Sequence, residues 1–145
     1  MKSNRIALAS LVLTVPVVLT LSGCSAFDEV VYREASSEYA DAPALNAEWD
    51  GDAPWVPRDA TDIRVAQSTR AADATILLSS GLELDPELCA EVPRQSSPTM
   101  SVDDAPDVFA MDTVFACGEW AVGQTPTGWL GWTPAHPDET EQSPS

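Results

Sequence analysis

The chain has 145 residues, of which 23 are acidic and 7 are basic, and its formal net charge is −16. This length supplies material for one domain. The negative charge excludes nucleic acid as a partner, because such a surface repels a phosphate backbone, and it also disfavours attraction to anionic lipid headgroups.

The N-terminal residues have the pattern of an export signal. Lys2 and Arg5 give a basic start, and an apolar run without charges follows over 6–21. This run is shorter than the ~20 residues that cross a bilayer comfortably, and Pro16 weakens a helix there. The pattern predicts a removable signal peptide at 1–23 rather than a permanent membrane span.

A short motif closes this region. Leu21-Ser22-Gly23-Cys24 resembles the lipobox of bacterial lipoprotein precursors, in which an aliphatic residue, a small residue and Gly or Ala precede a cysteine. The resemblance covers residues 1–24. It implies cleavage between Gly23 and Cys24, a diacylglycerol on the Cys24 thiol, and a mature chain held by lipid at the extracytoplasmic face of the cell membrane. The alternative is an uncleaved anchor with an incidental cysteine.

Cleavage would make the chain still more acidic. Lys2 and Arg5 leave with the signal peptide, whereas every acidic residue remains in the mature chain. Arginine is then the only basic residue type. A composition rich in Ala and Asp and without lysine is similar to that of proteins from high-GC Gram-positive bacteria.

The composition of residues 24–53 predicts a flexible tether, which would be lipidated at Cys24. Few large apolar side chains occur there, and the stretch beyond Arg33 is rich in Ala, Ser, Asp and Glu. Such a composition buries too little apolar surface to fold by itself and is typical of a solvated linker.

A small folded domain is predicted at 54–134. The alternation at 62–67 turns Ile63 and Val65 toward a core, which is typical of a half-buried strand, and 74–79 is an apolar run of strand length. The polar turn between the two runs predicts a hairpin.

A short helix is predicted at 84–92. Asp85 is a good N-cap, Pro86 suits the first helical position, and Pro93 ends the segment. We expect this helix to carry Cys89.

The last predicted elements are two strands, at 116–122 and 129–133. They flank a turn rich in Gly and Pro, which indicates a second hairpin. Residues 135–145 predict a frayed, disordered tail. Together, the elements predict the α+β class, with a small antiparallel sheet and one short helix between a disordered N-terminal tether and a disordered C-terminal tail.

Cys89 and Cys117 are the cysteines outside the lipobox. An even pair in an exported chain predicts a disulfide, which stabilises a loop of this length by roughly 3–4 kcal/mol in the chain-entropy model. Two free buried thiols are the alternative. A redox role is disfavoured because it normally uses a Cys-x-x-Cys spacing.

Patterns for catalysis and metal binding are weak. His136 is the only histidine and lies in the predicted tail, where nothing would hold it beside a nucleophile. Zinc needs four N or S ligands, more than one imidazole and two sulfurs supply. The acidic clusters at 50–52 and 103–107 lack the spacing of a calcium loop. We therefore expect no catalytic residue, no metal and no cofactor.

Trp120, Trp129 and Trp132 lie close together on the predicted C-terminal hairpin. In an extended strand, Leu130 and Trp132 share one face and Trp129 takes the other. Two interpretations stay open. The aromatic side chains either fill a small core, or an exposed Trp129 marks a recognition surface.

Three classes of function remain. The features favour a non-catalytic interaction or accessory domain, which its lipid displays to a protein partner in the cell envelope. The second class is a small-ligand- or solute-binding lipoprotein, although solute receptors are usually larger and two-lobed. The third is a cell-envelope enzyme, for which a buried carboxylate with a perturbed pKa in a well-formed cleft would be the sign.

Overall fold

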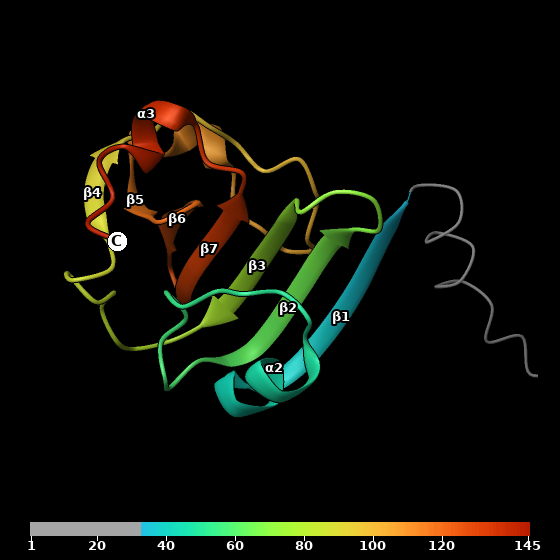
Figure 1. The fold of residues 1–145 in the computed structure, drawn as a ribbon. Helices are drawn as coiled ribbons and strands as arrows, with labels where there is room; N and C mark the ends of the chain where they lie inside the picture. The colour runs from blue at the N-terminus through green and yellow to red at the C-terminus, as the bar shows by residue number, and fades with distance from the viewer. Residues whose placement is uncertain (1–32) are drawn as a thin grey trace, which may run out of the picture.

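The computed structural model describes residues 33–145, and its main feature is one antiparallel sheet (Figure 1). Seven strands follow the order β1-β2-β3-β7-β6-β5-β4. The predicted class, a small antiparallel sheet with short helical structure and a Cys89–Cys117 disulfide, is confirmed. The predicted signal peptide, Cys24 and the beginning of the predicted tether lie outside the described residues.

The elements follow the chain in a simple order. The strands are β1 Glu34–Asp41, β2 Thr61–Ser68, β3 Ala74–Ser79, β4 Ala90–Pro93, β5 Thr113–Cys117, β6 Trp120–Thr125 and β7 Gly128–Thr133. The helical segments are α2 Ala42–Glu48, the 3-10 turn η1 Val108–Ala110 and α3 Pro137–Thr140. The strands predicted at 62–67, 74–79 and 129–133 correspond to β2, β3 and β7. No helix within residues 33–145 is long and apolar enough to cross a membrane.

The predicted hairpin of β2 and β3 is present. Val65 pairs with Ile76, and both side chains are buried, as the alternation of apolar residues predicts. The hairpin of β6 and β7 closes at the pair Thr125–Gly128. A Cβ on Gly128 would lie 2.4 Å from the carbonyl oxygen of Leu78 on β3, so a glycine is required by the close approach of backbone.

Both faces of the sheet are covered, and each face has its own core. Along β7, Trp129 packs into one core, and Leu130 and Trp132 pack into the other. The first core includes residues of α2 and of the segment that follows it, and the second includes Val108 of η1. Successive strand residues point to opposite faces, so β7 buries nearly every side chain.

The predicted C-terminal hairpin is in fact the last part of a three-stranded meander. Gly118 has a φ of +62°, which is the left-handed region that favours glycine, and it turns the chain between β5 and β6. The prediction of one continuous strand at 116–122 was therefore wrong, because this stretch contains the end of one strand, a turn and the beginning of the next.

The helix predicted at 84–92 is also absent. The Asp85 side chain does accept a hydrogen bond from the Glu87 amide at 2.9 Å, but only a turn forms. Ala90 pairs with Ala116 on β5, and the chain continues as strand β4. Local capping signals are outweighed here by strand pairing, which recovers the backbone hydrogen bonds and buries Val92.

Much of the predicted tether is folded. β1 pairs along its length with β2, and α2 follows directly, with the Asp41 carboxylate accepting the Ala44 amide at 2.9 Å. Leu45 of α2 is buried in the first core. The prediction of a flexible segment up to residue 53 was wrong because an edge strand and a capped helix need few apolar side chains once a neighbouring strand is present.

Candidate functional site

The three tryptophans predicted as candidate binding aromatics are buried. Trp120 and Trp129 are each 5% exposed, and Trp132 is fully buried. Their indole nitrogens donate hydrogen bonds inside the domain, to the carbonyl of Asp52, the carbonyl of Leu82 and the hydroxyl of Ser96 respectively. The predicted alternation of faces is confirmed, but the exposure of Trp129 is not observed, because the sheet is covered on both sides.

A different aromatic side chain is exposed. Phe109 of η1 is 74% exposed, and the Arg94 guanidinium lies 5.3 Å from the centre of its ring. That distance is within the range of a cation–π contact. The Arg94 guanidinium also donates to the carbonyls of Met111 and Ser96, so it is fixed beside the ring.

Tryptophans also build the first core from outside the sheet. The ring centres of Trp49 and Trp120 lie 6.3 Å apart, and those of Trp55 and Trp120 lie 5.8 Å apart. Trp55 lies against β7, where a Cβ on Gly131 would be 2.2 Å from its ring. Trp49 is only partly buried, and its side chain donates a hydrogen bond to Gln67.

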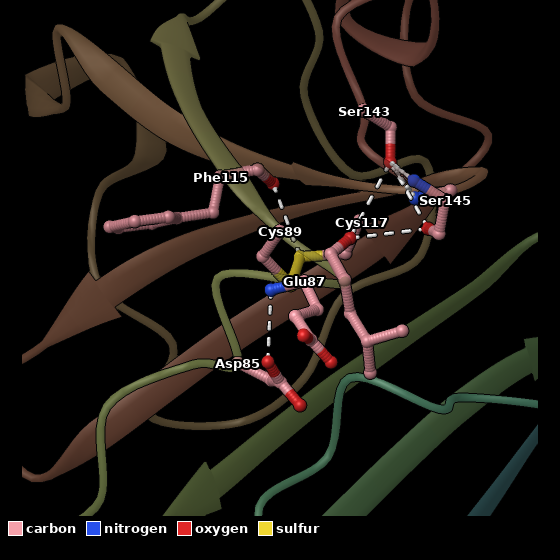
Figure 2. Close-up of a disulfide and its surroundings, with 9 residues drawn as sticks. Asp85, Glu87, Cys89, Phe115, Cys117, Ser143 and Ser145 are labelled. Atoms are coloured by element: carbon pink, nitrogen blue, oxygen red, sulfur yellow. Dashed lines mark hydrogen bonds between the residues drawn. A yellow bond between two sulfur atoms is a disulfide. The ribbon is translucent and has the colours of Figure 1, made fainter.

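The disulfide joins β4 to β5 at the edge of the sheet. Cys89 precedes the Ala90–Ala116 pair and Cys117 follows it, so the two cysteines oppose each other. Both are buried. Figure 2 shows the C-terminal serines beside the bond, where Ser143 Oγ accepts the Gly118 amide at 2.6 Å.

The predicted tail is folded against this region. His136 is the N-cap of α3, and its Nδ1 accepts the Asp138 amide at 3.1 Å. The prediction that nothing holds His136 rigid was therefore wrong, because the capping box fixes it between the sheet and α3. Its ring has a structural role in this cap.

Glu139 is fully buried, and its carboxylate accepts four hydrogen bonds. The donors are the amide of Gln95 at 2.6 Å, the amide and the hydroxyl of Ser96 at 3.0 Å and 2.5 Å, and the amide of His136 at 2.7 Å. Burial by itself raises the pKa of this carboxyl, but the hydrogen bonds outweigh it and hold the pKa below its usual value of 4.5. Glu139 is thus a buried anion that ties α3 to the loop after β4.

The acidic cluster at 103–107, one of the two considered for calcium, makes other contacts. The Arg64 guanidinium binds the Asp104 carboxylate at 2.8 Å and the Asp103 carbonyl at 3.1 Å. The Asp107 carboxylate caps η1. Within residues 33–145, no three His, Cys, Asp or Glu side chains are grouped as metal ligands would be.

A hollow of the surface lies where several turns meet at one end of the strands. Its part beside α3 has a volume of about 470 Å³. Apolar residues of this part are Ala72, Pro134, Ala135 and Pro137. A second part of about 380 Å³ continues toward Trp49 and Trp120. The two parts share Ala72, Asp73, Glu119 and Thr133, so they adjoin, and we treat them together as one groove.

Five carboxylates line this groove, and no arginine of residues 33–145 does. Asp50 and Asp52 belong to the part near Trp49, Glu141 to the part near α3, and Asp73 and Glu119 to both. We call the whole feature the acidic groove. These carboxylates make the lining negative, as much of the domain is.

Backbone hydrogen bonds hold the walls of the acidic groove in place. The Glu119 carbonyl accepts the Ala135 amide at 3.0 Å and the Thr133 hydroxyl at 3.1 Å. The Ser68 amide donates to the Asp73 carbonyl at 2.8 Å across the turn between β2 and β3. The groove is therefore preorganised by the turns that connect the strands.

A smaller hollow elsewhere on the domain carries a paired cation. It has a volume of about 420 Å³ and is lined by Arg64, Asp104, Asp62 and Thr125. Asp62 and Asp104 both have positive φ, and the buried Thr125 hydroxyl has no hydrogen-bond partner among the described residues. The ion pair of Arg64 with Asp104 leaves this hollow, as lined by residues of the described part, without an unpaired cation to attract a ligand.

Comparisons of the chain with protein-family models, with curated proteins and with solved structures found no match. Within the described residues, the features left to consider are the disulfide pair and the lining of the acidic groove. Of the groove residues, the sequence drew attention only to Asp50, Asp52 and Trp120. The others come from separate turns, and no local pattern joins them.

Proposed function

We propose that this chain is the precursor of a lipoprotein, cleaved before Cys24, whose folded domain is a non-catalytic interaction module at the extracytoplasmic face of the cell membrane. The lipobox Leu21-Ser22-Gly23-Cys24 carries this proposal. Two acyl chains on Cys24 would anchor the protein stably, since each buried methylene contributes ~0.8 kcal/mol.

The disulfide supports the assignment to an oxidising compartment. Disulfides persist in exported proteins and are rare where thiols are kept reduced. Cys89 and Cys117 are buried and bonded in register between two strands, as a structural disulfide is, with no Cys-x-x-Cys spacing.

The position of β1 limits how far the domain stands from the membrane. Only nine residues separate Cys24 from Glu34, the first residue of β1. A chain of this length spans at most about 35 Å even when fully extended. We therefore propose a partner that is itself close to the membrane surface, such as a membrane protein or another lipoprotein of the cell envelope.

A small-ligand-binding lipoprotein is the second candidate. The part of the acidic groove beside α3, at about 470 Å³, is within the range of ligand pockets, roughly 300–1,000 Å³. Several of its lining residues are exposed, however, so the groove is an open surface feature rather than an enclosed pocket.

Cell fractionation with mass spectrometry tests the anchor. We expect the wild-type protein in the membrane fraction, with an N-terminal peptide that begins at a diacylated Cys24. The Cys24→Ala variant should leave the membrane fraction. Equal membrane binding by the variant would contradict the proposal and indicate that residues 6–21 are a permanent anchor.

Crosslinking in living cells tests the interaction role. The wild-type protein should crosslink to a defined protein near the membrane, and Cys24→Ala should lose that crosslink because the domain is no longer held beside its partner. A wild-type protein that is anchored, makes no crosslink and co-purifies with a small molecule would favour the second candidate instead.

A further inference from the structure

We propose that two copies of this chain associate through β1, which pairs with the β1 of the second copy in antiparallel orientation and joins the two sheets. This inference goes beyond the proposed function, because it assigns a second copy to one edge of the sheet and does not depend on the lipid anchor. It follows from the free backbone of β1, from the form of the opposite edge and from the register that the charges of β1 select.

β1 is an edge strand, and no other strand of residues 33–145 pairs with its outer side (Figure 1). The Arg33 carbonyl accepts the Thr69 amide at 2.9 Å, so the odd-numbered residues at the beginning of this strand form hydrogen bonds with β2. The N–H and C=O groups of Glu34, Ser36 and Glu38 therefore point away from β2. Outward groups of this kind are a template on which a further strand pairs.

The two edges of the sheet differ in how well they accept a strand. β4 has four residues, and its last residue, Pro93, has no amide hydrogen to donate. β1 has eight residues and no proline, and its pairs with β2 keep one register from Glu34 to Tyr39. Edge strands are commonly protected by proline, bulges or charges, and β1 has only charges. These charges restrict the register of pairing.

The acidic side chains of β1 select the position of the twofold axis between two copies. The outward groups of Glu34, Ser36 and Glu38 must pair with one another. An axis at Ser36 places Glu34 opposite Glu38, and an axis at Glu38 places that residue opposite its own copy, and like charges directly opposite are destabilising. An axis at Ser37 pairs Ser36 with Glu38 of the second copy and places no two carboxylates directly opposite each other. An axis nearer the N-terminal end pairs a shorter part of β1.

The register with its axis at Ser37 also brings opposite charges together at both ends of the strand pair. Arg33 of one copy then lies opposite Asp41 of the other, and the twofold symmetry repeats the pair. Arg33 is exposed and makes no ion pair with residues 33–145. Asp41 is also exposed, and only its Oδ1 atom is used to cap α2. Ala35 lies opposite Tyr39, which adds an apolar contact on the face of the first core.

The dimer is expected to be weak in solution. An interface made by one strand from each copy is small, and both copies are strongly negative. Salt screens this repulsion between the copies. Copies that share the proposed lipid anchor would associate more readily, because confinement at one membrane surface raises their effective concentration.

A cysteine at the proposed axis tests the register. In the purified chain from residue 24, made with Cys24→Ala and an intact disulfide, Ser37→Cys places two thiols opposite each other. Opposite residues that exchange no hydrogen bonds have Cα atoms ~4.5 Å apart, which is within disulfide range. Ala35→Cys is the matched control on the same face, because its two copies are not opposite each other. With glutathione disulfide as the oxidant, we expect Ser37→Cys to give a covalent dimer at least about fivefold faster than the control.

Charge reversal tests the ion pairs at the two ends. Sedimentation equilibrium in about 0.3 M NaCl, which screens the net repulsion, measures the dissociation constant of the dimer. Arg33→Glu and Asp41→Arg should each weaken the dimer about tenfold, because two attractive pairs become repulsive. An equimolar mixture of the two variants should associate as well as the wild type, because opposite charges again face each other at both ends. Loss of the α2 cap in Asp41→Arg cannot explain such a recovery.

Three results would overturn the inference. They are a wild type that stays monomeric up to about 1 mM protein, equal rates of covalent dimer formation by Ser37→Cys and Ala35→Cys, and a mixture that associates no better than either charge variant. The first result would leave the edge of β1 to another segment or to a different protein. Every measurement uses protein without lipid, so a failure here leaves the lipoprotein proposal untouched.

Discussion

Glu139 is the only charged side chain that is buried within residues 33–145. A buried carboxylate is costly unless hydrogen bonds replace its hydration, and here four donors do so. One donor, the Ser96 hydroxyl, itself accepts the Trp132 indole at 2.9 Å. The chain from Trp132 through Ser96 to Glu139 thus links the second core to α3.

Replacing this carboxylate should destabilise the domain. We expect Glu139→Gln to lower the free energy of unfolding at pH 7 by about 2–4 kcal/mol. The amide nitrogen of the new glutamine is a donor, and it would face the backbone amides and the hydroxyl that now donate to the carboxylate. Chemical denaturation at pH 7 measures this loss. Glu141→Gln, an exposed neighbour, is the matched control and should change stability by less than about 0.5 kcal/mol.

The same carboxylate predicts a pH dependence. The pKa of Glu139 in the folded state lies below its usual value of 4.5, so the ionised form stabilises the fold. This contribution is complete above the unfolded pKa and is lost as the pH falls through the folded pKa. The difference in stability between wild type and Glu139→Gln should therefore shrink as the pH falls below 4.5 and through the folded-state pKa. A difference that stays constant over this range would contradict the role of the charge.

No local signal in the sequence identifies Glu139 as a buried residue. It lies among Pro, Asp, Thr and Gln, a composition typical of a solvated tail. The capping-box pattern with His136 is readable in retrospect, but histidine is an unusual N-cap. Three of the four donors that make the burial favourable, from Gln95 and Ser96, are some forty residues away in the sequence.

At the scale of elements, the disulfide supports the shortest strand of the described residues. β4 has four residues, lies at the edge of the sheet and ends at Pro93. We expect the Cys89→Ala, Cys117→Ala variant to lose roughly 3–4 kcal/mol of stability, because the bond closes a loop of 28 positions in the unfolded chain. Urea denaturation with and without a reductant measures this. An unchanged midpoint would show that β4 needs no covalent support.

The C-terminal segment is the second element with a clear prediction. Deleting residues 136–145 removes α3 and the Glu139 carboxylate, and it leaves the amides of Gln95 and Ser96 without their acceptor. We expect the melting temperature to fall by more than about 10 °C. Deleting only Pro144 and Ser145 is the control and should have a small effect, because α3 and Ser143 remain. If deleting residues 136–145 left the melting temperature unchanged, this result would instead agree with the disordered tail that the composition predicts.

At the scale of the whole molecule, the charge balance should make stability depend on salt. The chain carries 23 acidic and 7 basic residues, and the compact state brings the acidic ones together. Raising NaCl from about 0.02 M to 0.5 M shortens the Debye length from roughly 20 Å to 4 Å, so the melting temperature should rise. The melting temperature of the variant Glu83→Gln, Glu91→Gln, Asp112→Asn should rise less with salt, because this variant carries fewer negative charges. A melting temperature that falls with salt would contradict net repulsion.

The class of fold, the disulfide pair and three of the strands could be predicted from the amino-acid sequence alone. β2, β3 and β7 could be identified from alternation and apolar runs, because the signal for each strand lies within its own residues and the turns beside it. The pairing of Cys89 and Cys117 was predictable because an even pair of cysteines in a chain that is predicted to be exported has few other uses.

The edges of the sheet, the burial of the tryptophans and the acidic groove emerge only from the folded arrangement. β1 and β4 form because a neighbouring strand supplies hydrogen-bond partners, which no local pattern reveals. Trp129 is buried because the second face of the sheet is also covered. The groove exists because turns that are distant in sequence meet at one end of the strands, and such meetings depend on strand order rather than on the composition of any one segment.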